Sequence, residues 1–85
     1  MQAHELSPLE ELAAADEKRA ALGYVHEAFA EAILSGVEAD CFAHAALFAA
    51  FQELVETYGE EAVAVYAARL PERIRMGEFT VGLRQ

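Results

Sequence analysis

A chain of 85 residues with 55% hydrophobic content is expected to form one small domain, 1–85. Its formal net charge of −9 argues against binding to nucleic acid or to anionic membranes. A single cysteine, Cys41, excludes an intramolecular disulfide, and no apolar run approaches the length of a membrane span, so we expect a cytoplasmic protein. The Ala-, Glu- and Arg-rich usage is typical of high-GC bacterial genomes.

The charge is unevenly distributed along the chain. Residues 1–68 carry two basic side chains against thirteen acidic ones, a net charge of −11, whereas residues 69–85 carry four arginines against two glutamates, a net charge of +2. Arg69, Arg73 and Arg75 therefore form a possible anion-binding or docking patch. The alternative is that these arginines only complement the negative end of a helix dipole.

The first predicted helix begins at Pro8. Ser7 is a candidate N-cap, Pro8 suits the first helical position, and Glu10 completes a capping box. Larger apolar residues follow at spacings of three and four, as on one face of a helix: Leu22, Val25, Phe29 and Ile33.

Gly23 lies inside this segment and costs a helix about 1 kcal/mol relative to alanine. The pattern therefore predicts either one long helix over residues 8–35 or two helices that meet near Gly23. Gly36 is expected to cap the C-terminal end.

The second predicted helix begins near residues 38–40, with Asp40 as a candidate N-cap, and stops at Gly59. It has a wide apolar face, which we expect to form the core of the domain or an interface: Phe42, Leu47, Phe48, Phe51, Leu54, Val55 and Tyr58. Because this face is wider than one neighbouring helix can cover, it favours self-association.

The third predicted helix opens with Glu60 and Glu61, which suit the positive end of a helix dipole. Pro71 ends it and starts a short helical turn, Pro71–Met76. Apolar residues alternate in the tail, 78–85, which predicts an extended segment that docks on the bundle, pairs with a partner or is disordered. Residues 1–6 are expected to be a flexible or docked terminus.

Cys41 and His44 lie three residues apart on the second helix, and His26 could approach them if the first two helices pack antiparallel. These three residues are weak candidates for a metal site, because a lone pair at this spacing is common by chance. The acidic side chains of Glu38 and Asp40 nearby disfavour a negatively charged sulfur at Cys41, which argues against a catalytic thiolate. No glycine-rich phosphate loop occurs. We therefore expect no catalytic residue, no bound metal and no cofactor, and hence no enzyme.

The sequence predicts an all-α fold, a small up-and-down bundle of three main helices with a short C-terminal helical turn and an extended tail. The function it favours is a protein–protein interaction or structural module that acts as a homodimer. The alternative is an acidic regulator or inhibitor of a basic protein surface, similar in kind to antitoxins or nucleic-acid mimics. A metal-binding protein that uses Cys41 and His44 is a third hypothesis.

Overall fold

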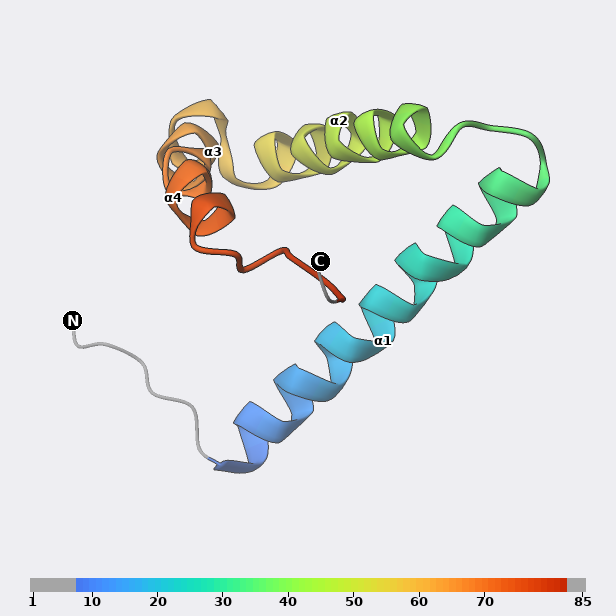
Figure 1. Cartoon of the computed structure of the whole chain (residues 1–85). Helices are drawn as coiled ribbons and strands as arrows, with labels where there is room; N and C mark the ends of the chain where they lie inside the picture. The colour runs from blue at the N-terminus through green and yellow to red at the C-terminus, as the bar shows by residue number, and fades with distance from the viewer. Residues whose placement is uncertain (1–7, 83–85) are drawn as a thin grey trace. The chain divides into compact units, whose positions relative to one another are not determined.

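The computed structural model describes residues 8–82, within which four helices follow one another (Figure 1). They are α1 (Pro8–Leu34), α2 (Ala39–Tyr58), α3 (Glu60–Ala67) and α4 (Leu70–Arg75). Helices make up 81% of the described residues, and no strand occurs among them. The predicted all-α fold class is therefore confirmed, with α4 as the short C-terminal helical turn.

The chain divides into two compact units, Met1–Ala43 and His44–Gln85, with the division inside α2. The first unit contains α1, the turn after it and the start of α2. The second contains the rest of α2 with α3 and α4. Each unit is described by itself below, and the expected single domain stays a prediction.

In the first unit, α1 is one continuous helix that passes through Gly23, so the first of the two alternatives is correct. Gly36 ends it with a φ of 93°. The backbone N–H groups of Gly36 and Val37 donate to the carbonyls of Ile33 and Ala32 at 3.0 and 2.9 Å, which is a Schellman motif. The predicted cap at Gly36 is confirmed, whereas the candidate N-cap Ser7 lies outside the described residues.

α2 begins within the predicted range, at Ala39, but its N-cap lies two residues before the predicted one. The carbonyl of Glu38 accepts the first helical hydrogen bond, from the N–H of Phe42 at 3.0 Å, so Glu38 is the N-cap. Asp40 lies in the first turn of α2, where its carboxylate suits the positive end of the helix dipole. The prediction of Asp40 as the N-cap was therefore wrong.

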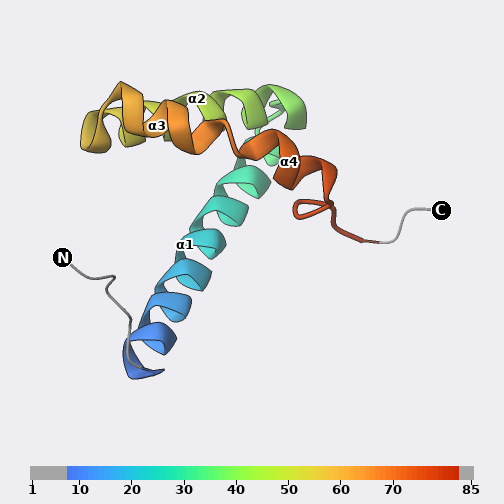
Figure 2. The same ribbon diagram turned by 90° about the vertical axis from the view of Figure 1, so that its left-hand side faces the viewer.

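In the second unit, Gly59 separates α2 from α3. Its φ of 90° lies in the left-handed region that favours glycine, and its carbonyl accepts the N–H of Val63 at 3.2 Å. Glu60 and Glu61 occupy the first turn of α3, as predicted. After a turn at Ala68 and Arg69, the chain continues into α4 (Figure 2). The predicted final turn begins one residue early, at Leu70.

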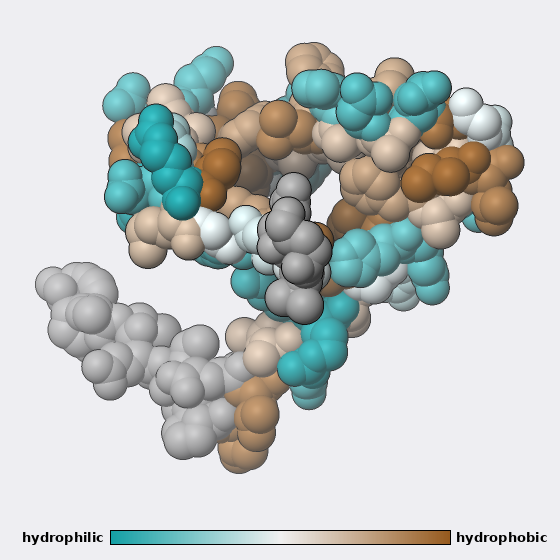
Figure 3. Space-filling view, in the orientation of Figure 1, coloured by the Kyte–Doolittle hydropathy of each residue, from teal (hydrophilic) through white to brown (hydrophobic). Residues whose placement is uncertain are grey.

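Few apolar side chains are buried in the described part of the chain. Val63, which is 8% exposed, is the one hydrophobic residue there that counts as buried. On α2, Phe42, Phe51, Leu54 and Val55 are half-buried, whereas Leu47 and Tyr58 are exposed and Phe48 is 67% exposed. Figure 3 shows hydrophobic side chains, in brown, at the surface over α2, α3 and α4. Whether these α2 residues serve as a core or as an interface therefore stays a prediction.

Of the helices in residues 8–82, none combines the length and the apolar character that a membrane span requires.

Candidate functional site

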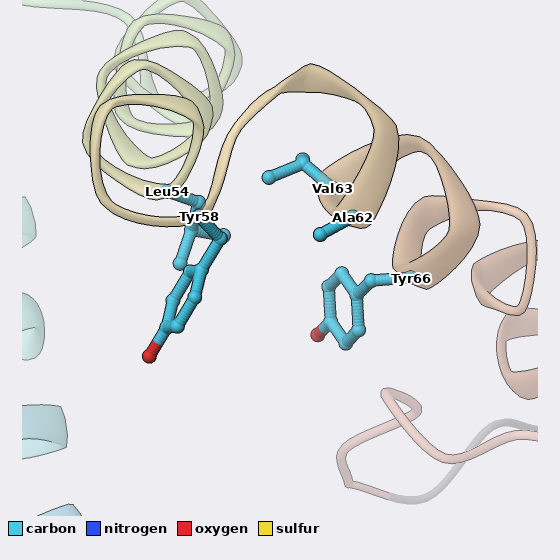
Figure 4. Close-up of a pocket in the computed structure, with 5 residues that line it drawn as sticks. All are labelled: Leu54, Tyr58, Ala62, Val63 and Tyr66. Atoms are coloured by element: carbon cyan, nitrogen blue, oxygen red, sulfur yellow. The ribbon is translucent and has the colours of Figure 1, made fainter.

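An apolar groove runs along one side of α2 in the second unit. Its first section, of about 330 Å³, lies between the end of α2 and α3. Figure 4 shows the rings of Tyr58 and Tyr66 on opposite sides of its opening, with both hydroxyl groups pointing the same way. The residues that line this section come from α2 and α3: Leu54, Tyr58, Ala62, Val63 and Tyr66.

The second section, of about 440 Å³, continues from the first because both share Leu54 and Tyr66. It lies between α2 and α4 and reaches the turn after α4. The residues that line it are mostly large and apolar: Leu47, Ala50, Phe51, Leu54, Tyr66, Leu70, Ile74 and Phe79. We refer to the two sections together as the apolar groove.

The helical period explains why these residues gather. On α2, positions 47, 51, 54 and 58 recur at spacings of four and three, so they share one face of the helix. Across the bend between α3 and α4, Tyr66, Leu70 and Ile74 recur every fourth residue and lie opposite that face. Four of the seven residues that the sequence placed on the apolar face of α2 line the groove: Leu47, Phe51, Leu54 and Tyr58.

A third hollow, of about 400 Å³, lies along another side of α2. Phe48, Phe51 and Val55 line it together with the polar residues Gln52 and Glu56. Phe51 therefore contributes to both sides of the helix. The wide apolar face expected from the sequence is present as two adjacent surfaces.

Arg73 links Tyr66 on α3 to Glu78 in the turn after α4. Its Nε and Nη2 atoms donate to Oε1 and Oε2 of Glu78 at 2.8 and 2.5 Å, a two-point ion pair. Its Nη1 atom makes a longer contact, of 3.5 Å, with the hydroxyl of Tyr66. The Arg73 side chain is 34% exposed and that of Glu78 is 48% exposed, so solvent screens the pair only in part.

The guanidinium of Arg73 also lies near two aromatic rings. Its carbon is 5.9 Å from the ring centre of Tyr66 and 5.4 Å from that of Phe79, within the range of a cation–π interaction. The hydrogen bond to Glu78, and then the one to Tyr66, raise the pKa of Arg73 above its already high ordinary value. We call Arg73, Glu78, Tyr66 and Phe79 the arginine clasp.

The three residues of the arginine patch proposed from the sequence thus differ in their contacts and exposure. Arg73 is engaged with Glu78, while Arg69 and Arg75 are exposed. Sequence reasoning missed the role of Glu78 and Phe79. A signal was available: a glycine at position 77 indicates a Schellman motif, and such a motif brings positions 73 and 78 together.

The candidate metal ligands do not form a ligand set in residues 8–82. Cys41 is exposed, and no group of three or more His, Cys, Asp or Glu side chains there could hold a metal ion. His26 is on α1 and is exposed, while Cys41 and His44 are one turn apart on α2.

Comparisons with protein-family models, with curated proteins and with solved structures find no match to this chain.

Proposed function

We propose that this chain is an acidic helical interaction or structural module that acts as a homodimer, with the apolar groove in the interface. The observation that carries the proposal is the groove itself: a continuous apolar surface on α2, α3 and α4 that the side chains of the second unit leave open. Each square ångström of apolar surface removed from water contributes about 25 cal/mol, so covering such a surface stabilises an assembly.

A second copy of the chain suits this surface for two reasons. Short chains bury a small fraction of their surface and often gain stability by association. A two-fold axis would also let each copy offer the same apolar residues, so that one self-complementary surface covers both grooves. The exposed side chains of Leu47, Tyr58 and Ile74 would then be removed from water in both copies.

The test is sedimentation equilibrium across micromolar concentrations at about 0.15 M salt, where long-range repulsion between the acidic chains is screened. We expect a monomer–dimer equilibrium for the wild type. A species of 9.3 kDa at every concentration would rule out the homodimer.

A matched pair of variants locates the interface. Ile74 lines the groove and is 59% exposed, whereas Val65 on α3 is 57% exposed and lines neither section. Ile74→Gln should weaken the dimer about tenfold, because about 1–2 kcal/mol of apolar burial is lost, and Val65→Gln should leave it within about twofold. Equal effects of the two changes would place the interface elsewhere.

The second candidate is an acidic regulator that occupies a basic surface on another protein. It is favoured by the charge of −11 over residues 1–68 and by exposed acidic residues along α1, such as Glu27 and Glu31. A monomer in sedimentation that captures a basic protein, and releases it as salt rises to about 0.5 M, would favour this function over the homodimer.

A further inference from the structure

Phe79 lines the apolar groove but does not lie in a helix. It lies four residues after the end of α4, in the turn that follows Arg75. Side chains in such turns are usually positioned by contacts of their own. The contacts that hold this turn therefore decide whether the groove has its far wall.

The backbone supplies the first of these contacts. Gly77, at a φ of 88°, reverses the chain, and its N–H donates to the carbonyl of Ile74 at 3.1 Å. The N–H of Glu78 donates to the carbonyl of Arg73 at 3.1 Å, which completes a Schellman motif. The motif turns the chain back beside α4 and brings the side chains at positions 73 and 78 together.

The side chains at these two positions commonly make an apolar contact in a Schellman motif. Here they form a two-point ion pair instead, between Arg73 and Glu78. A planar guanidinium fixes the orientation of its partner better than a single ammonium could. The pair therefore joins the last turn of α4 to Glu78, and Phe79 is the next residue.

The same guanidinium lies between α3 and the turn. It contacts the Tyr66 hydroxyl on α3 and is 5.4 Å from the ring centre of Phe79. Tyr66 and Phe79 both line the second section of the groove. Arg73 thus contacts one aromatic residue on α3 and another in the turn after α4.

We propose that the Arg73–Glu78 ion pair holds Phe79 as the far wall of the apolar groove and thereby sets the affinity of the groove for a second copy of the chain. This inference rests on the proposed homodimer and names the residues that position its binding surface. Without the pair, Phe79 would have to be ordered during association, and the loss of conformational entropy would weaken the dimer. Arg73 and Glu78 act as positioning residues in this role.

The experiment compares Arg73→Gln and Glu78→Gln with two controls on α4, Arg75→Gln and Glu72→Gln. Each control makes the same chemical change to an exposed residue outside the clasp. Both clasp variants should weaken the dimer about fivefold in sedimentation equilibrium, and both controls should stay within about twofold of the wild type. The double variant Arg73→Gln/Glu78→Gln should be no weaker than the single variants, because each change alone already breaks the pair.

A second readout follows the clasp directly. The Nε–H proton of Arg73 donates to Glu78 beside two aromatic rings, so its NMR signal should be shifted and protected in the wild type and should lose both properties in Glu78→Gln. Circular dichroism of each variant is the control for loss of helix.

The outcomes separate the two proposals. A wild type that dimerises, with an unchanged dissociation constant in both clasp variants, would overturn the positioning role and leave the homodimer intact. A wild type that stays monomeric would overturn both. Weakening in the controls equal to that in the clasp variants would show a general effect of charge and would also overturn the positioning role.

Discussion

The rings of Phe29 and Phe42 meet edge to face, with their centres 4.7 Å apart and their planes at 77°. Phe29 lies on α1 and Phe42 in the first turn of α2, so the pair closes the turn between the two helices within the first unit. This geometry places the positive edge of one ring against the negative face of the other.

The Phe29–Phe42 pair should contribute a coupling free energy of about 0.5–1.5 kcal/mol beyond the area that it buries. A double-mutant cycle with Phe29→Leu and Phe42→Leu, followed by urea unfolding, measures this coupling. Tyr24→Leu removes an exposed ring from the same helix and serves as the control. Strictly additive losses in the double variant would show that the rings do not interact in solution.

The helix boundaries could be predicted from the sequence because glycines mark them. Gly36, Gly59 and Gly77 each adopt a positive φ at a helix end, where the pattern of apolar residues also stops. The sequence could not decide whether the first helix continues through Gly23. Glycine costs a helix about 1 kcal/mol, which is small against the hydrogen bonds of a 27-residue helix, so it permits a continuous helix without requiring one. Only the structure decides between the two outcomes.

The apolar spacing of the sequence indicates both faces that line the groove, one on α2 and one that includes Tyr66, Leu70 and Ile74, but it does not show that the two faces lie opposite each other. The spacing of Leu47, Phe51 and Leu54 places these residues on one face of a helix but does not identify the element that lies against it. The opposite wall depends on how the chain bends at Ala68 and Arg69, which periodicity does not reveal. For the tail, docking on the bundle was one of three alternatives, and Phe79 does lie beside Arg73 and line the groove.

Phe51 and Phe48 should respond differently to truncation. Phe51 is half-buried and lines the groove, so Phe51→Ala should lower the free energy of unfolding by about 3–5 kcal/mol once a second copy covers it. Phe48 is exposed on the other side of α2, and Phe48→Ala should change the free energy by no more than about 0.5 kcal/mol. The two changes are chemically identical and lie on the same helix, so each controls for the other.

Thermal unfolding at two protein concentrations measures both effects. The loss at Phe51 should be larger at the concentration where the dimer predominates. An unchanged melting temperature in Phe51→Ala would show that Phe51 stays exposed, and a loss at Phe48 as large as that at Phe51 would place the interface on the other side of α2.

The purified, untagged chain should contain no stoichiometric zinc or iron. Cys41 and His44 offer two ligands one helical turn apart, whereas a structural zinc ion requires four. Elemental analysis measures the metal content, with Cys41→Ser and His44→Ala as the matched variants. One metal ion per chain in the wild type, lost in either variant, would contradict this prediction and would favour the metal-binding hypothesis.

Two glycine-to-alanine changes should shift stability in opposite directions. Gly23 lies inside α1, and a Cβ added there would meet no heavy atom within 4 Å, so Gly23→Ala should stabilise the helix by about 0.5–1 kcal/mol. Gly77 has a φ of 88°, where an L side chain is strained, so Gly77→Ala should cost about 1–2 kcal/mol. The added Cβ would lie 3.7 Å from Oγ1 of Thr80, an ordinary contact, so the cost at Gly77 comes from the backbone and not from a clash.

Urea unfolding followed by circular dichroism measures both glycine variants, and the clasp gives Gly77→Ala a second signature. If the left-handed residue is needed to bring Arg73 and Glu78 together, Gly77→Ala should also remove the shifted Nε–H signal of Arg73, whereas Gly23→Ala should leave that signal in place. Gly77→Asn is the informative intermediate, because asparagine tolerates the left-handed region better than alanine and should recover part of both the stability and the signal. Equal losses for asparagine and alanine would show that the conformation at position 77 does not govern the clasp.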